Sequence, residues 1–294
     1  MKRFILSIDG GGMRGIYSAL LLQHLETRAE KQCFELFDLI GGTSIGGILA
    51  FGLSTGITAK NMVGMFEDNI PKIFKKDWKH SCKTLWGITG SKYDPKNIDY
   101  FLDSLFGDNK IQTVLVDTLC VARDIKNAKY NILKSYKLDP VSIKEACRCT
   151  SSAPTFFPSY KLGKQLNVDG AMFMNNPSLI LWTEAKKLYP YDDIYILSIG
   201  TGNFTKKYDI KNGGMKDWAI PAIEILSDSN TEGIDYIMER GVGNHLRLQI
   251  ELDNPIKLDS IDTKDIDILK QCANDTYIIM KEKIDRFLGN IIIK

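Results

Sequence analysis

The sequence predicts an α/β fold in which a mostly parallel sheet carries helices on both faces. Short apolar runs that are typical of buried strands alternate along the chain with segments of helical periodicity. Several of the predicted strands end in turns rich in glycine, serine or aspartate, and the functional groups of such sheets collect at the carboxyl ends of the strands. A length of 294 residues allows one large α/β domain or two small ones.

The elements of the N-terminal half follow from the spacing of apolar residues. Short continuous apolar runs before a turn predict buried strands, and apolar residues repeated at helical spacing predict helices. In chain order we predict a strand at 4–8, a helix at 16–30, a strand at 37–40, a helix at 48–53 and strand-like runs at 114–116 and 119–122.

The same reasoning extends to the C-terminal half. The predicted elements are a helix at 142–150, a strand at 166–168, a helix at 179–188, strands at 193–199 and 246–252, and a terminal helix at 263–288. Residues 203–217 have the least regular pattern. Because no internal repeat or clear linker interrupts the chain, we expect residues 1–294 to form a single domain. Its motifs lie within 4–202, and the C-terminal strand and helix, within 246–288, pack on the same domain.

Composition excludes several functions. The formal net charge of +2 gives no argument for nucleic acid binding, which requires a strong basic excess. No apolar stretch approaches the roughly 18 residues of a membrane span, and the apolar run after Met1-Lys2-Arg3 is too short for a signal peptide. We therefore expect a cytoplasmic protein, or one exported by a route that the sequence does not show. The six dispersed cysteines and three histidines form no zinc pattern, so we expect buried, reduced thiols, no metal site and no cofactor.

Residues 42–46, GTSIG, have the pattern G-x-S-x-G between a predicted strand and a small-residue helix. This is the strand–turn–helix setting of a nucleophile elbow, in which small flanking residues allow the tight turn. Ser44 would lie at a helix N-terminus, where the partial positive charge stabilises a developing alkoxide. The alternative is an ordinary tight turn with a capping serine.

A second glycine-rich turn, residues 10–15 with the sequence GGGMRG, also fits the dinucleotide-binding pattern G-x-G-x-x-G. That function needs an acidic residue at the end of the next strand; Glu35 and Asp38 lie nearby, but the strand ends in the serine motif. Gly11 and Gly12 lack side chains, so their N–H groups can approach a ligand closely and stabilise a tetrahedral oxyanion. The order of the motifs favours hydrolysis, with phosphate binding by this loop as the alternative.

A serine nucleophile needs a base, and two candidates stay open. His245 follows Ser44 and the acidic residues in the chain, so the order permits a Ser–Asp–His triad. Asp169 follows a predicted strand and faces the same sheet edge as Ser44; burial can raise the pKa of a carboxylate until it serves as the base. An aspartate before glycine is also a common turn former. His24 lies mid-helix, where a structural role is more typical, and His80 lies in a basic stretch.

Together these motifs resemble the patatin-like phospholipase family. Residues 9–15 match its D-G-G-G-x-R-G loop, residues 42–46 its G-x-S-x-G and residues 169–171 its D-G-G/A. Three supporting blocks also match, at 151–157, 175–177 and 198–202. The resemblance covers roughly residues 4–202, and more loosely 246–273. The order and spacing of three motifs are more specific than any single motif.

The resemblance implies a three-layer α/β/α sandwich and a serine–aspartate dyad without histidine. In that dyad Ser44 attacks an ester carbonyl and Asp169 accepts its proton. The resemblance further implies that the N–H groups of Gly11, Gly12 and Ile45 form the oxyanion hole. Family members hydrolyse acyl esters of phospholipids, lysophospholipids, galactolipids or neutral lipids, and this chemistry requires no calcium.

The family motifs also imply supporting residues around this centre. The supporting glycines are Gly10, Gly15, Gly42, Gly46 and Gly170. Arg14, by its place in the family loop, fixes that loop or binds lipid phosphate, and the alternative is a solvated first-turn arginine. We expect a hydrolase of the phospholipase A or lysophospholipase type, with a membrane or micellar glycerolipid as its substrate.

Residues 70–86, IPKIFKKDWKHSCKTLW, interleave lysines with bulky apolar side chains. A basic face with aromatic residues suits peripheral contact with an anionic lipid surface, or a lid over the site. The alternative is a solvated basic surface whose aromatic side chains pack inward.

Overall fold

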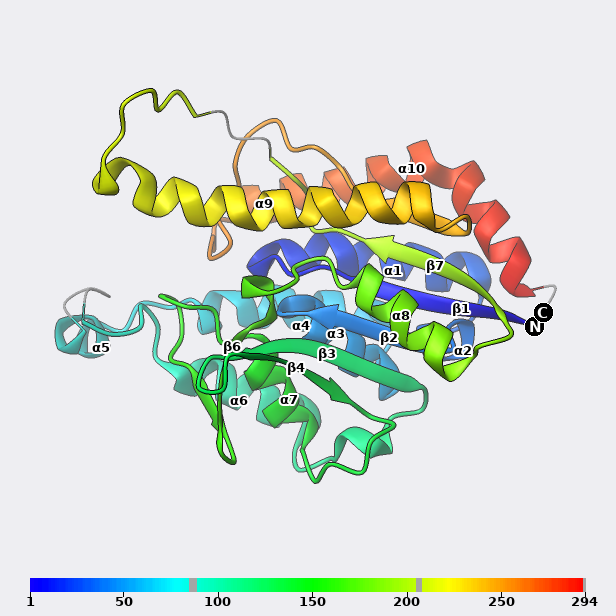
Figure 1. The fold of residues 1–294 in the computed structure, drawn as a ribbon, viewed down its shortest axis with the longest axis horizontal. Helices are drawn as coiled ribbons and strands as arrows, with labels where there is room; N and C mark the ends of the chain where they lie inside the picture. The colour runs from blue at the N-terminus through cyan, green and yellow to red at the C-terminus, as the bar shows by residue number, and fades with distance from the viewer. Residues whose placement is uncertain (85–88, 205–207, 293–294) are drawn as a thin grey trace.

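A mixed sheet forms the middle layer of the molecule, which the computed structural model describes for residues 1–84, 89–204 and 208–292 (Figure 1). Within those ranges its strands are β1 (Lys2–Ile8), β2 (Leu39–Thr43), β3 (Asp117–Asp124), β4 (Lys129–Lys134), β5 (Tyr160–Leu162), β6 (Gln165–Asp169), β7 (Asp193–Ile199) and β8 (His245–Leu248). Each strand pairs with its neighbours in the series β5-β6-β3-β2-β1-β7-β8, and β4 also pairs with β3. The central strands β3, β2, β1, β7 and β8 are parallel, whereas β4, β5 and β6 join through antiparallel pairs.

Helices cover both faces of the sheet, as the sequence predicts. They are α1 (Gly15–Ala29), α2 (Cys33–Leu36), α3 (Ile45–Ser54), α4 (Ala59–Ile73), α5 (Trp78–Lys83), α6 (Pro95–Phe106), α7 (Ile143–Thr150), α8 (Ser178–Leu188), α9 (Met215–Gly241) and α10 (Thr263–Ile292). Phe4, Leu6 and Ile8 of β1 pack in the larger core with α1, α3, α4 and α10. Ile5 points to the opposite face and packs with α8 and the C-terminal part of α9. The result is the expected three-layer α/β/α arrangement.

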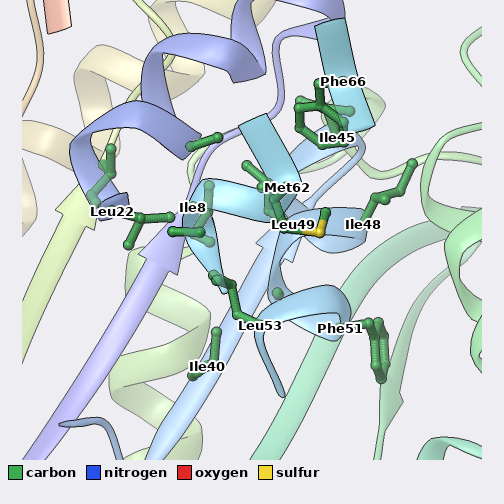
Figure 2. Close-up of a cluster of buried hydrophobic side chains, with 14 of the residues drawn as sticks. Ile8, Leu22, Ile40, Ile45, Ile48, Leu49, Phe51, Leu53, Met62 and Phe66 are labelled. Atoms are coloured by element: carbon green, nitrogen blue, oxygen red, sulfur yellow. The ribbon is translucent and has the colours of Figure 1, made fainter. Parts of the chain in front are cut away.

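Helix α3 is enclosed on all sides. All its residues are buried, which explains why its sequence is apolar around the whole helix and not along one stripe. Figure 2 shows Leu49 and Leu53 of α3 in one cluster of buried side chains with Met62 and Phe66 of α4. The residue that precedes α3 is therefore mounted on a rigidly packed helix.

The structure corrects two predictions about secondary structure. Residues 114–116 form a bend and not a strand, because Leu115 is exposed and its N–H donates to the carbonyl of Ser54; β3 begins only at Asp117. Residues 203–217 were expected to be irregular, yet α9 begins at Met215. Most of α9 escaped prediction because Gly233 and several polar residues interrupt its apolar pattern.

Candidate active site

Strands β2 and β6 meet end to end along one edge of β3. Strand β4 pairs with residues 119–124 of β3 along one edge. The opposite edge is shared by β2, which pairs with residues 117–121, and β6, which pairs with residues 122–124. Thr43, the last residue of β2, lies opposite Val121, and Asp169, the last residue of β6, lies opposite Ala122. The sequence predicts Ser44 and Asp169 at one sheet edge if the strands before them are parallel. Here β6 is antiparallel to β3, and its carboxyl end converges on that of β2.

Ser44 lies on a sharp turn between β2 and α3. Its backbone has φ 55° and ψ −123°, a positive-φ conformation that non-glycine residues rarely adopt. Its N–H donates to Thr150 Oγ1 at 2.9 Å. A Cβ atom on Gly42 would lie 2.1 Å from the carbonyl oxygen of Gly46, and one on Gly46 would lie 2.3 Å from that of Ile8. These distances explain why both flanking positions are glycine, and the geometry is that of a nucleophile elbow.

The Ser44 hydroxyl donates a hydrogen bond to Asp169, with 2.5 Å between Oγ and Oδ2. The other carboxylate oxygen, Oδ1, accepts the N–H of Ala171 at 2.8 Å. Burial raises the pKa of Asp169 to about 6, although both hydrogen bonds act in the opposite direction. Among the described residues no cation forms an ion pair with this carboxylate. Within the described part of the chain, the partners of the buried Asp169 carboxylate are therefore neutral donors, the Ser44 hydroxyl and the Ala171 amide.

The glycine loop after β1 has two amides for which the described residues supply no hydrogen-bond acceptor. The N–H of Gly10 donates to the carbonyl of Asn175 at 3.2 Å. The next amide with a partner is that of Met13, which donates to the carbonyl of Leu258 at 2.8 Å. Among the residues that the structure describes, the two amides between them have no acceptor. They remain available to a ligand.

These two amides belong to Gly11 and Gly12. A Cβ on Gly11 would lie 2.2 Å from Thr201 Oγ1. Gly12 has φ 56°, and a Cβ there would lie 2.3 Å from the carbonyl oxygen of Leu258. The N–H of Ile45, at the start of α3, likewise has no acceptor in the described part of the chain. All three residues line the same cavity.

The cavity has a volume of about 620 Å³ and also includes Ser44 and Asp169 in its lining. Much of the lining is apolar and comes from α3, α4, α6 and the segment after α7: Ile48, Phe66, Ile70, Ile73, Phe74, Ile98, Phe101, Phe156 and Phe157. Polar lining comes from the glycine loop, α9 and the ends of β7 and β8: Arg14, Thr201, Asn203, Asp228, Thr231 and Gln249. A site with these two kinds of lining suits an amphipathic ligand.

Comparison with known proteins agrees with this geometry. The family model described as patatin-like phospholipase matches residues 6–182. The chain belongs to the patatin-like phospholipase family. Lipid acyl hydrolysis is the activity that this membership supports.

Two plant members illustrate how far the likeness to this patatin-like chain extends. Patatin-like protein 2 of Arabidopsis thaliana is 26% identical over 96% of this chain and 84% of its own length. Patatin-like protein 1 of the same plant is 31% identical over 79% of this chain and 69% of its own. Among solved structures, VipD from Legionella pneumophila matches 93% of this chain and 67% of its own, with 11% identity and a TM-score of 0.47.

Arg14 of the patatin-like loop is not a solvated surface residue. It lines the cavity, and burial lowers the pKa of its guanidinium from the ordinary value, while nearby Asp228 acts in the opposite direction. Within the described ranges its Nε atom has no hydrogen-bond partner. A Cβ on the next residue, Gly15, would lie 2.6 Å from the side chain of Ile45, and one on Gly170 would lie 2.1 Å from the carbonyl oxygen of Val121. The supporting glycines are thus required by close packing.

Sequence reasoning missed a buried ion pair beside the glycine loop. The two carboxylate oxygens of Asp9 face Nη1 and Nη2 of Arg247 at 3.1 and 2.6 Å. Burial raises the pKa of Asp9 to about 6, although Arg247 acts in the opposite direction. Polar and apolar residues alternate through 245–250, which resembles an ordinary strand with one solvated face. The sequence therefore carries no signal that this arginine is buried.

His245 and His24 of this patatin-like chain lie apart from Ser44. His245 begins β8 and lies opposite Ile196, three residues before the carboxyl edge, which corresponds to roughly 10 Å along the strand. Strands β1 and β7 separate β8 from β2. Burial lowers the pKa of His245 to about 4. His24 bonds Asn274 at 2.8 Å on the α1–α10 side, so these two histidines have structural surroundings.

The residues that would complete a dinucleotide site are elsewhere. Asp38 precedes β2, at the amino end of the sheet, where it accepts the N–H of Phe4 at 2.8 Å and pairs with Arg3 at 3.1 Å. Glu35 accepts the N–H of Gln32 at 2.8 Å. Neither acidic residue lines the cavity. Neither of these two acids is therefore placed to bind a ribose beside the glycine loop.

Proposed function

We propose that this protein is a serine lipid acyl hydrolase that cleaves carboxylic esters of phospholipids or related glycerolipids and releases free fatty acid. We assign it to the phospholipase A or lysophospholipase type, with residues 1–294 acting as a single domain. The observation that carries the proposal is the 2.5 Å hydrogen bond between Ser44 and Asp169 at a largely apolar cavity of about 620 Å³. A hydroxyl bonded to a buried carboxylate, beside unbonded amides, is suited to ester hydrolysis.

The first half of the reaction acylates Ser44. As Oγ bonds to the ester carbonyl carbon, its proton passes to Oδ2 of Asp169, the atom to which it is already hydrogen-bonded. The carbonyl electron pair moves onto oxygen and gives a tetrahedral intermediate. When the intermediate collapses, the ester C–O bond breaks and the leaving alcohol takes the proton from Asp169. The acyl group remains on Ser44 as an ester.

The second half releases the fatty acid. Asp169, again ionised, removes a proton from a water molecule that attacks the acyl carbonyl. A second tetrahedral intermediate forms and collapses, and the Ser44 oxygen leaves with the proton that Asp169 holds. A pKa of about 6 suits both tasks, because the group is ionised near neutral pH and is still basic enough to accept a proton.

The developing negative charge needs donors that are in place before the reaction. The unbonded amides of Gly11, Gly12 and Ile45 line the cavity with Ser44, and we assign them to the oxyanion hole. Each such donor contributes about 3 kcal/mol to lowering the barrier. The N-terminus of α3, which begins directly after Ser44, adds its partial positive charge.

Peripheral contact with a lipid surface is assigned to residues 70–86. The structure divides this segment: Ile70, Ile73 and Phe74 are buried and line the cavity, whereas Trp78 is 68% exposed. The exposed lysines are at positions 72, 75, 76 and 83. Leu85 and Trp86 lie outside the described residues. In the described ranges, no helix combines the length and apolar character needed to cross a membrane.

A fluorophosphonate serine probe tests the proposal without a choice of lipid. Wild type, S44A, D169N and H245A are labelled side by side, and the adduct is located by mass spectrometry. We expect labelling at Ser44 that requires Asp169 and is retained in H245A. Fatty acid release from phosphatidylcholine vesicles is then measured with the same four proteins. Equal loss in D169N and H245A would indicate a triad, and labelling at another residue would overturn the assignment.

A further inference from the structure

Arg247 lies at the centre of a buried polar cluster beside the glycine loop. Its side chain is 8% exposed. Besides the two contacts with Asp9, its Nη1 donates to Ser198 Oγ at 2.8 Å, and its Nε lies 3.1 Å from Oδ1 of Asp235 on α9. One guanidinium thus lies between two carboxylates, in surroundings where an unpaired charge is costly. A planar guanidinium suits this geometry, because it can bond both oxygens of one carboxylate at once.

The contact of Arg247 with Asp9 fixes the start of the glycine loop. The N–H of Asp9 donates to the carbonyl of Ile199 at 3.0 Å, which continues the pairing of β1 with β7. A Cβ on Gly46 would lie 2.6 Å from the carbonyl oxygen of Asp9. The backbone of Asp9 therefore touches the first turn of α3, directly before the loop begins. Holding its side chain holds the loop against the turn that carries Ser44.

The contact of Arg247 with Asp235 leads to the glycine loop through a second set of residues. Asn176 donates its Nδ2–H to Oδ1 of Asp235 at 2.7 Å. The preceding residue, Asn175, accepts the N–H of Gly10 at 3.2 Å. Arg247 is thus connected to both residues that anchor the loop, Asp9 by direct contact and Asn175 through Asp235 and Asn176.

We propose that Arg247 is a positioning residue that sets the Gly11 and Gly12 amides in place for the reacting oxygen. This inference rests on the proposed function. Oxyanion donors stabilise charge only within a narrow range of distance, so a small displacement of the loop costs rate without removing any group that touches substrate. Arg247 itself is absent from the lining of the cavity. Its effect falls on kcat and leaves KM nearly unchanged, because ground-state binding uses the apolar lining.

The test uses R247M, R247K and the double variant D9N/R247M. Hydrolysis of p-nitrophenyl butyrate gives kcat and KM, and thermal unfolding gives Tm. We expect R247M to lower kcat about 30-fold with KM within about twofold, and R247K, which keeps the charge but not the bidentate contact, to recover part of the loss. In the double variant no buried charge of the pair remains, so Tm recovers relative to R247M while kcat stays low.

The matched control is K134M. Lys134 also forms a buried ion pair, with Glu184 at 2.6 Å, and its side chain is 8% exposed. Lys134 is the last residue of β4 and lies opposite Leu119 of β3. It is not among the residues that line the cavity. We expect K134M to lower Tm and to leave kcat unchanged.

Each outcome decides the inference. If kcat recovers together with Tm in D9N/R247M, or if K134M lowers kcat as much as R247M, Arg247 only stabilises the fold. If R247M does not fold, R247K decides: an unchanged kcat overturns the inference, and a kcat at least about fivefold lower at unchanged KM supports it. A wild-type protein without esterase activity or Ser44 labelling would instead contradict the proposed function.

Discussion

Asp9 and Asp169 are two buried aspartates at strand ends beside one cavity, and they differ in what their oxygens face. Burial raises the pKa of each to about 6. Both oxygens of Asp9 face the guanidinium of Arg247, whereas those of Asp169 accept the Ser44 hydroxyl and the Ala171 amide. Under the same burial, one carboxylate faces a cation in an ion pair and the other accepts hydrogen bonds from two neutral groups. The partner, and not the carboxylate, decides the role.

The difference has a simple chemical basis. Asp169 can take up a proton while its neutral partners stay satisfied, which is what the proposed function requires of a base in each catalytic cycle. Protonation of Asp9 would leave a buried guanidinium with less compensating charge, which is unfavourable. The predictions below test this contrast, from the largest expected effect to the smallest.

The D169N variant tests the contrast between the two aspartates most directly. Removal of the base is expected to lower kcat/KM for p-nitrophenyl butyrate by roughly 10³- to 10⁴-fold, because Ser44 then has no group to accept its proton. S44A, assayed in the same way, defines the background rate. A D169N variant within tenfold of wild type would show that another group acts as the base.

The pH profile gives the next largest effect. Since Asp169 must be ionised to accept the proton and its pKa is raised to about 6, kcat/KM should fall about tenfold per pH unit below that value and level off above it. Between pH 8 and pH 4 the expected decrease is about 100-fold, measured on protein shown to stay folded. A flat profile through pH 6 would contradict the role of Asp169.

Substitution of the other aspartate should have a smaller effect. D9N keeps the size of the side chain and one acceptor oxygen but removes the charge that faces Arg247. We expect kcat to fall about tenfold through displacement of the loop, with KM nearly unchanged. The inflection near pH 6 should persist in D9N, because it belongs to Asp169. Its disappearance would mean that Asp9 is the titrating group.

Stability should move opposite to activity in D169N. The pKa of the Asp169 carboxyl is about 6 in the folded protein and near 4 in the unfolded chain. The carboxyl therefore stabilises the fold at pH values below about 4, and this stabilisation is lost as the pH rises through about 6. Asparagine cannot ionise and avoids the loss. At pH 8 we expect the Tm of D169N to exceed that of wild type by about 5 °C, with the difference vanishing near pH 4. Differential scanning fluorimetry over this range checks both ends.

The smallest effect is expected for H245A. Its side chain lies at the far end of β8 from the carboxyl edge, and its lowered pKa keeps it neutral at assay pH. Esterase activity should stay within about twofold of wild type when folding is confirmed by Tm. A loss of esterase activity comparable to that of D169N would favour a Ser–Asp–His triad over the dyad.

Local chemistry made part of this molecule predictable. The elbow at Ser44 needs small neighbours, and the loop at Gly11 and Gly12 needs residues without side chains, so short patterns revealed both. Buried parallel strands such as β1 and β7 were visible as continuous apolar runs.

Pairings between distant segments were not predictable in the same way. Asp9 and Arg247 are 238 positions apart, and nothing in the alternating strand pattern distinguishes a buried arginine from an exposed one. The antiparallel direction of β6 depends on how it shares an edge of β3 with β2, which the short predicted strand at 166–168 does not specify.

The contact between Met13 and Leu258 has a consequence for biosynthesis. Ser44 and Asp169, the nucleophile and base of the proposed function, are both present once translation has reached Asp169, but the carbonyl that accepts the N–H of Met13 is added only with Leu258. The start of the loop can bond Asn175 and Ile199 earlier in synthesis, whereas Met13 has its acceptor only once Leu258 is present. The proposed oxyanion hole is therefore fully held only after Leu258 has been added.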